Sequence, residues 1–154
     1  MGHPGRTDGD SGSQSGAFEV IEAQKKRLHT TRGFVAVKPN CSIQSYAPVL
    51  TAWMEFEPTE VVATTYQAIS GAGKTFQDWP EMVENIIPYI GGEEEKSEQE
   101  PLRIWGKVCD GKIEKASSPV ITTQCIRVPV LDGHTAAVLS TLRKSRRKNS
   151  SLKS

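Results

Sequence analysis

The chain has 154 residues, of which 36% are apolar and 24% are charged, a composition typical of one globular domain of ordinary size. The formal net charge is only +1, so no overall field favours nucleic acid or an anionic membrane surface as a partner. Three cysteines without CxxC spacing argue against a zinc site and a disulfide framework, so we expect a reducing, cytoplasmic setting and no bound metal.

Both ends of the chain are polar and differ in composition from its middle. Residues 1–16 are mostly Gly, Ser and Asp, which bury too little apolar area to offset the entropy lost on ordering, so we expect them to be disordered. Residues 139–154 are rich in Lys, Arg and Ser, and we expect a basic, disordered tail there. The folded domain is therefore predicted over residues 17–138. No apolar run in this sequence approaches the roughly 20 residues of a membrane span.

The first half of the predicted domain reads as helix, strand and helix. Residues 18–28 place apolar side chains at helical spacing, which predicts a helix. The apolar stretch 34–37 predicts a short strand. Helical spacing resumes after Cys41 and predicts a helix that starts near Ser45, with Pro48 in its first turn, where proline is tolerated. This order would place Cys41 between a strand end and a helix N-terminus.

The second half is richer in strands. Residues 59–69 and 120–130 contain many β-branched side chains and predict strands, and β character resumes at 134–139. The acidic run 93–100 is expected to lead from a loop into a helix that Pro101 ends, with most of its glutamates on a solvated face. This alternation indicates an α/β or α+β fold with a mixed sheet and flanking helices. Several connections are long for a compact domain, so either elements are missed or the chain is part of a larger fold.

Three residue types suggest chemistry. The thiol of Cys41 becomes a useful nucleophile when its pKa is lowered, which the positive end of a helix favours, although free cysteine is more often a small buried apolar residue. His134 follows a turn and could transfer protons near neutral pH, or it could simply face water. Arg127 lies in an apolar strand and either binds a carboxylate or faces solvent at a sheet edge.

The stretch AISGAGKT, residues 68–75, matches the P-loop pattern except that Ala68 stands where the first glycine belongs. A degenerate P-loop NTPase is therefore an alternative, although residues 76–80 form a poor helix start. In the simpler interpretation, Gly71 and Gly73 let the backbone approach a phosphate or a ring closely.

Four segments together resemble the aspartate-semialdehyde dehydrogenase family, especially its archaeal and fungal branch. They are GFVAVKPNCSIQ (33–44), TYQAISGAGKTF (65–76), NIIPYIGGEEEKSEQE (85–100) and ITTQCIRVPVLDGHTAAV (121–138). The resemblance implies the catalytic and dimerisation domain of a semialdehyde dehydrogenase, truncated at both ends and without most of the Rossmann-like nucleotide domain. No Gly-rich G-x-x-G-x-x-G stretch precedes Cys41 in this sequence.

The resemblance also implies a reaction, the reversible NADPH-dependent conversion of β-aspartyl phosphate to aspartate semialdehyde in lysine, threonine and methionine synthesis. Cys41 would form a thioester with the β-aspartyl group, His134 would be the acid/base catalyst, and Gln67 would orient the substrate. Ser70 and Gly71 would contact the cofactor, NADP(H).

The remaining implied roles concern substrate binding. Arg127 would bind the α-carboxylate of the substrate, Glu93 its amine, and Lys96 and Asn40 its phosphate. The family implies a homo-oligomer, so the alternative to an enzyme is an inactive remnant that keeps the dimer surface and acts as an interaction module.

Overall fold

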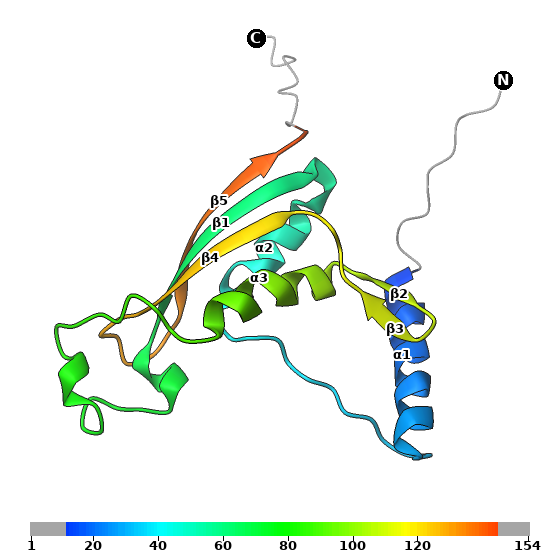
Figure 1. The fold of residues 1–154 in the computed structure, drawn as a ribbon, viewed down its shortest axis with the longest axis horizontal. Coiled ribbons are helices and arrows are strands. Elements are labelled where there is room, and N and C mark those ends of the chain that lie inside the picture. Colours follow the sequence, from blue (N-terminus) through cyan, green and yellow to red (C-terminus); the bar gives the residue numbers. More distant parts are fainter. Residues whose placement is uncertain (1–11, 145–154) are drawn as a thin grey trace, which may run out of the picture.

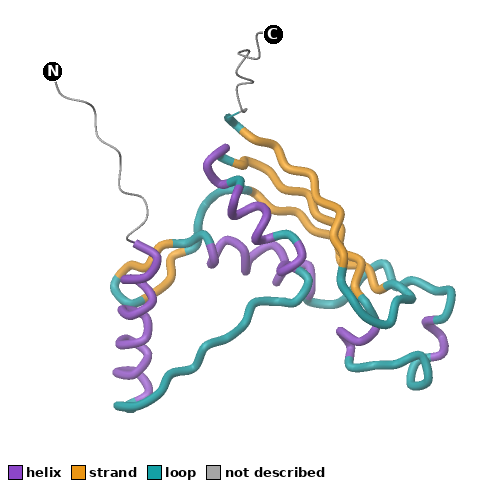
Figure 2. Tube along the Cα trace, turned by 180° about the vertical axis from the view of Figure 1, so that it is seen from behind, coloured by secondary structure: helices purple, strands orange, loops and turns teal. Residues whose placement is uncertain are grey.

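The computed structural model describes residues 12–144, and their side chains from residue 18. Its centre is a mixed three-stranded sheet in the order β4-β1-β5. The middle strand β1 (Pro58–Gln67) runs parallel to β4 (Val120–Arg127) and antiparallel to β5 (Thr135–Leu142). The helices α2 (Ala47–Ala52) and α3 (Glu93–Ile104) lie on one side of this sheet (Figures 1 and 2). The predicted α+β fold with a mixed sheet and flanking helices is confirmed.

Alternation along the strands decides which side chains form the core. Along β1, Val61 and Ala63 point toward the helices, and the register places Ile121 of β4 beside Val61. Ile43 and Leu50 pack on these residues in one buried cluster. Burial of several such side chains, each worth about 1.5–3 kcal/mol, attaches the chain around Cys41 to the sheet.

The opposite face of the sheet has no cover from any element within residues 12–144. The register places apolar side chains side by side on this face, with Val62 opposite Leu139 and with Val120 one strand away. All three side chains are exposed, and Leu139 keeps 72% of its surface accessible. An apolar face of this kind is a candidate interaction surface.

The helix α3 continues through Pro101 to Ile104, so the predicted end at Pro101 is wrong. A proline inside a helix lacks the N–H that would bond to the carbonyl four residues earlier, here that of Ser97. The hydroxyl of Tyr46 donates to this carbonyl at 3.2 Å and replaces the missing bond. Burial raises the pKa of Tyr46 far above its usual value, so the phenol keeps its proton. A contact between two helices thus makes this proline tolerable.

The acidic run of α3 is also not the solvated face that its composition predicts. Glu98 accepts the backbone N–H of Thr123 at 3.0 Å, and Glu94 accepts that of Cys125 at 3.2 Å. These amides lie on the edge of β4 that faces away from β1. The carboxylates therefore satisfy a strand edge that would otherwise be open to pairing with another chain.

Two further predictions around Cys41 need correction. Residues 34–37 form no strand, because no strand within residues 12–144 pairs with them; only the side chain of Gln24 bonds both backbone groups of Val35, at 2.7 and 2.9 Å. The predicted helix near Ser45 is divided into a 3₁₀ turn, Ile43–Ser45, and α2, which starts at Ala47 with Pro48 in its first turn.

The helix α1 (Gly12–Leu28) packs beside a hairpin that was not predicted from the sequence. It is formed by β2 (Lys107–Cys109) and β3 (Lys112–Glu114). The Asp110-Gly111 turn, with φ of 51° and 70°, provides the tight reversal between these strands. The helix α1 begins before the expected domain start at residue 17. The other expected boundary, residue 138, falls inside β5; residues 1–11 and 145–154 of the predicted disordered ends lie outside the described residues. No described helix is long and apolar enough to cross a membrane.

Candidate active site

The candidate site lies where the two parallel strands end. Gln67 is the last residue of β1 and Arg127 is the last residue of β4, and the register pairs them. Beyond these ends the two segments that follow the strands stay hydrogen-bonded. Ile69 and Ser70 donate their N–H groups to the carbonyls of Val130 and Leu131. The carboxyl ends of parallel strands are the usual place for a ligand in open sheets.

Cys41 lies at this edge in a tight turn rather than at the N-terminus of a long helix. Its side chain is exposed. The side chain of Asn40 holds the turn by accepting the backbone N–H of Ser42 at 2.8 Å, and Gln44 bonds the carbonyls of Pro39 and Asn40. A short 3₁₀ turn provides little macrodipole, so the expected position of Cys41 at the positive end of a helix is not found.

One cavity of about 290 Å³ brings most of the predicted site residues together. Its lining consists of Lys38, Asn40, Cys41, Gln67, Gly71, Glu93, Lys96, Glu100 and Arg127. The cations Lys96 and Arg127 thus share a cavity with the thiol. Of the predicted residues, His134 and Ser70 are not in this lining.

His134 nevertheless contacts the same cluster. Its Nδ1 accepts the backbone N–H of Ala68 at 3.1 Å. A Cβ placed on Gly71 would lie 2.9 Å from His134 Nε2 and 3.0 Å from Arg127 Nη1. Burial, and secondarily the charge of Arg127, lower the pKa of His134, so the imidazole is neutral at neutral pH. Because Nδ1 accepts a hydrogen bond, Nε2 carries the proton of this neutral ring.

Arg127 is only 6% exposed and still has no carboxylate within salt-bridge distance among residues 12–144. Its Nη1 donates to the carbonyl of Ala68 at 2.7 Å, which orients the guanidinium. Burial lowers the pKa of Arg127, while the nearby Glu93 and Cys41 act to raise it. Arginine stays charged in proteins, so its remaining donors suit a carboxylate from a ligand.

The start of α3 contributes a charged cluster to the same cavity. Glu93 accepts hydrogen bonds from Lys96 at 2.9 Å and from the side-chain amide of Asn40 at 2.7 Å. Burial alone would raise the pKa of Glu93, but these two bonds outweigh it and leave the pKa below its usual value. The bond with Glu93 raises the pKa of Lys96. Both groups are therefore charged at neutral pH.

Gln67 and Ser70 differ in how they relate to the cavity. Gln67 is buried and its amide donates to Thr65 Oγ1 at 3.2 Å, which leaves its carbonyl side available at the cavity wall. Ser70 is exposed in the 3₁₀ turn Ile69–Ala72 and does not line the cavity.

The same turn shows that the P-loop interpretation is wrong. A P-loop must open directly into a helix, whereas here the 3₁₀ turn ends at Ala72 and Gly73 follows with φ of 67°. Thr75 and Asp78 then form a local turn, with Thr75 Oγ1 donating to Asp78 Oδ2 at 2.7 Å. No helix therefore presents its N-terminus to a phosphate at this loop.

Lys38 and Glu100 also line the cavity, although neither was predicted as a site residue. Glu100 follows Glu93 and Lys96 at helical spacing, so a helix through residue 100 would have placed it on the same face. Its carboxylate accepts the backbone N–H of Asn40 at 2.6 Å. Lys38 precedes the Cys41 turn, and its closeness to Cys41 in the sequence is the feature that could have indicated its place in the lining.

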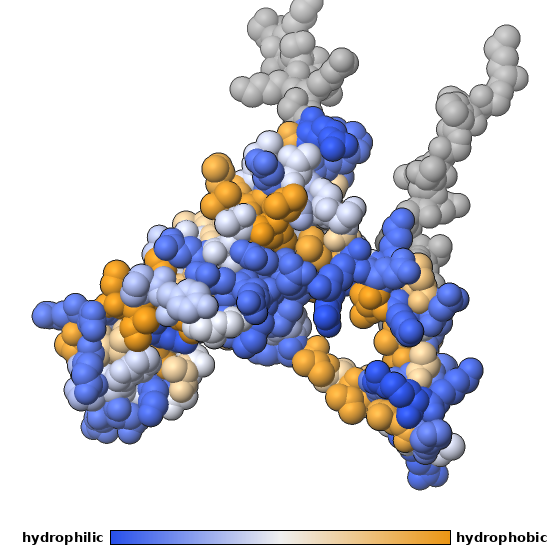
Figure 3. Space-filling model, in the orientation of Figure 1, coloured by the Kyte–Doolittle hydropathy of each residue, from blue (hydrophilic) through white to orange (hydrophobic). Residues whose placement is uncertain are grey.

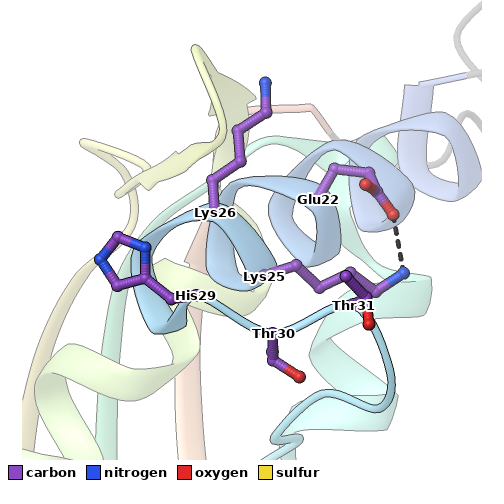
Figure 4. A pocket seen from close by; sticks show the side chains of 6 residues that line it. All are labelled: Glu22, Lys25, Lys26, His29, Thr30 and Thr31. Atoms are coloured by element: carbon purple, nitrogen blue, oxygen red, sulfur yellow. Dashed lines mark hydrogen bonds and ion pairs between the residues drawn. The ribbon is translucent and has the colours of Figure 1, made fainter.

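Other hollows in the described residues lack this chemistry. A shallow hollow of about 550 Å³ at the end of α1, which includes the Lys25–Glu22 ion pair, contains no candidate site residue (Figure 4). A groove of about 880 Å³ lies between α1, the hairpin and residues 34–37, whose apolar side chains are visible as an orange strip in Figure 3. Within residues 12–144, no cluster of three His, Cys, Asp or Glu residues could hold a metal.

A family model described as the semialdehyde dehydrogenase dimerisation domain matches residues 47–153, which is more than half of the chain. The chain belongs to the semialdehyde dehydrogenase family. Among curated relatives, the aspartate-semialdehyde dehydrogenase of Methanothermobacter thermautotrophicus is 38% identical over 122 residues, 79% of this chain and 35% of the relative. That of Archaeoglobus fulgidus is 41% identical over 119 residues, 77% of this chain and 34% of the relative.

Among solved structures, an aspartate-semialdehyde dehydrogenase with NADP from Candida albicans superposes with a TM-score of 0.67 at 30% identity. The match covers 86% of this chain and 38% of that enzyme. The resemblance to the aspartate branch of the family is thus confirmed. The chain spans about a third of the length of the curated relatives that it matches.

Proposed function

We propose that this chain performs the acyl-transfer chemistry of an aspartate-semialdehyde dehydrogenase. The thiolate of Cys41 attacks the acyl carbon of β-aspartyl phosphate, a C–S bond forms, the acyl C–O bond to phosphate breaks, and phosphate leaves. The main support is that one cavity holds Cys41 together with Arg127, which has no ion-pair partner within residues 12–144, and with the charged pair of Glu93 and Lys96. Thioester formation replaces one difficult acyl reduction by two easier steps.

The charges around the cavity match the charges of this substrate. The buried guanidinium of Arg127 would bind the α-carboxylate as a bidentate pair, and Glu93 would bind the α-ammonium group. The remaining anion, the phosphate, would be bound by Lys96 and by the side-chain amide of Asn40. Three contacts of opposite charge would orient the acyl carbon toward Cys41 without a change in the fold.

His134 and Gln67 would act on the reacting carbonyl. Neutral His134 carries its proton on Nε2, on the side of Gly71, where it can donate to oxygen as negative charge develops. Gln67 at the cavity wall would orient the acyl group. This arrangement gives His134 an acid role when the aldehyde forms and a base role in the reverse direction.

The family implies NADP(H), and Gly71 gives one observation on its fit. The place of a Gly71 side chain is filled by His134 and Arg127, so glycine is needed there for these two groups rather than for a ring. Gly71 also lines the cavity that holds Cys41, and exposed Ser70 precedes it in the same turn, so both would meet a cofactor that enters the cavity from this side. When bound, the cofactor would supply the hydride for reduction of the acyl group. Ser70 and Gly71 fit only its reacting end.

The acyl-transfer step can be tested separately from the hydride step. The chain would be mixed with β-aspartyl phosphate and its intact mass measured, with hydroxylamine added to cleave thioesters. We expect one hydroxylamine-sensitive aspartyl group, lost in Cys41→Ser and kept in Cys109→Ser, which removes another exposed thiol. Phosphate-dependent NADPH formation from aspartate semialdehyde and NADP then tests the complete reaction. Labelling that survives Cys41→Ser would contradict the proposal.

We also infer that the open face of the sheet joins two copies of this chain. The exposed apolar side chains of Val62, Val120 and Leu139 on this face support the inference, together with the dimerisation domain matched from residue 47. Light scattering should show a dimer for the wild type and a monomer for Leu139→Glu. Val83→Glu, at an exposed apolar position outside the sheet, is the matched control and should leave the dimer unchanged.

A further inference from the structure

A chain of buried hydrogen bonds runs from β4 to the Cys41 turn. Ser42, Ser97 and Cys125 are each 0% exposed, yet they lie on three different elements. Ser42 Oγ is 3.3 Å from Ser97 Oγ, and Ser97 Oγ is 3.7 Å from Cys125 Sγ. At the other end, Ser42 Oγ donates to Asn40 Oδ1 at 2.8 Å.

The donors and acceptors in this series of hydrogen bonds allow only one direction, in which each group donates toward Asn40. A hydroxyl has a single proton. The proton of Ser42 is used on Asn40, so the hydroxyl of Ser97 must donate to Ser42. The thiol of Cys125 must then donate to Ser97. Each bond in such a directional chain polarises the next one.

Because Ser97 donates to Ser42, the hydroxyl proton of Ser42 points to the amide of Asn40. Its Oδ1 accepts both the hydroxyl and the backbone N–H of Ser42, each at 2.8 Å. Its Nδ2 consequently faces the carboxylate of Glu93 at 2.7 Å. An ionised carboxylate can only accept hydrogen bonds, so Glu93 requires the nitrogen of the Asn40 amide, and not its oxygen, on its side. Within the described part of the chain the second Nδ2 proton has no acceptor, so it is available to the cavity, which Asn40 lines.

We propose that Ser97 is a positioning residue that acts through Ser42 to present an N–H donor of Asn40 to an anionic ligand in the cavity. The proposal rests on the proposed function, in which the Asn40 amide binds the phosphate group of the substrate, and adds the buried residue that holds this donor in place. Ser97 itself is buried beneath the turn and does not line the cavity.

Protection of Cys41 from iodoacetamide by inorganic phosphate tests this proposal. Ser97→Ala should raise the phosphate concentration that gives half protection by roughly fivefold, the equivalent of one hydrogen bond. Ser42→Ala removes the next link and should have the same effect. Ser140→Ala, which removes a serine bonded to the carbonyl of Glu60 on the sheet, should have no effect.

The Asn40→Ala background separates positioning from a general structural role. If Ser97 acts through Asn40, then Ser97→Ala added to Asn40→Ala changes the half-protection concentration no further. An equal change in both backgrounds, or no change in Ser97→Ala alone, overturns the proposal. Circular dichroism checks that each variant is folded.

A second readout keeps this inference separate from the proposed function. If phosphate fails to protect the wild type, the phosphate site in the proposed function is wrong. The positioning role is then decided by the side-chain amide signals of Asn40 in NMR spectra. Loss of their protection from solvent exchange in Ser97→Ala, but not in Ser140→Ala, supports the inference; unchanged exchange refutes it.

Discussion

Replacement of Gly71 by alanine probes the most crowded contact of the candidate site. The added Cβ would lie 2.9 Å from His134 Cε1 and Nε2 and 3.0 Å from Arg127 Nη1. Ordinary carbon contacts are about 3.5–4.0 Å, so both side chains would have to move by several tenths of an ångström. Neither is free to do so, because backbone groups of Ala68 hold His134 at 3.1 Å and Arg127 at 2.7 Å.

The expected magnitude follows from two opposing effects. Overpacking costs about 1–3 kcal/mol, whereas a Gly→Ala change at an allowed φ stabilises by about 0.4–1 kcal/mol through the unfolded chain. Gly71 has no positive φ, so we expect a net destabilisation of about 1 kcal/mol. Displacement of His134 should reduce acylation by β-aspartyl phosphate by about tenfold to a hundredfold.

Gly91 provides the matched control, since it also lacks a positive φ and a Cβ there would meet nothing within 4 Å. Urea unfolding and the acylation rate would be measured for Gly71→Ala and Gly91→Ala. Gly91→Ala should be as stable as the wild type or slightly more stable, with unchanged acylation. If the two variants behave alike in both measurements, His134 and Arg127 do not crowd Gly71 and the site geometry is wrong.

Three further predictions concern stability, measured by urea unfolding. Tyr46→Phe should destabilise the protein by about 1–3 kcal/mol, because a buried carbonyl of α3 loses its donor. Pro101→Ala restores the helical N–H and should rescue most of this loss. Equal losses with and without Pro101→Ala would contradict this explanation. Glu98→Ala should lower the free energy of unfolding by about 1–2 kcal/mol, because it leaves the amide of Thr123 at the edge of β4 unpaired. Glu95 is exposed, and Glu95→Ala should lower this free energy by almost nothing. Equal effects of the two variants would refute the role of Glu98 at the strand edge. Because the folded pKa of His134 is lowered, the unfolded chain binds more protons below about pH 6.5. Stability should therefore fall as the pH drops from 7 toward 5.5, with a smaller slope in His134→Asn; an unchanged slope would show that His134 is not the group responsible.

Much of the sheet was predictable because strands are indicated by the types of residues that follow one another in the sequence. The β-branched residues of 59–69 and 120–130 predict strands whose observed bounds differ by only a few residues. The same local reasoning failed for residues 34–37, since an apolar stretch becomes a strand only if another strand supplies its hydrogen bonds. It also failed at Pro101, where a hydroxyl from another helix, that of Tyr46, replaces the missing N–H.

The sequence alone was sufficient to name the residue types of the candidate site, the family resemblance and the positions of the main strands along the chain. The proposed chemistry would depend on rare side chains, such as Cys41 and His134, that stand out against their neighbours in the sequence. Only the tertiary structure decided which charges meet. Among residues 12–144, Arg127 has no carboxylate within salt-bridge distance and donates instead to the carbonyl of Ala68. The side-chain amide of Asn40 donates to Glu93, which is far away in the sequence. Such pairings depend on distances across the fold, and these arise only when the strands and α3 pack together.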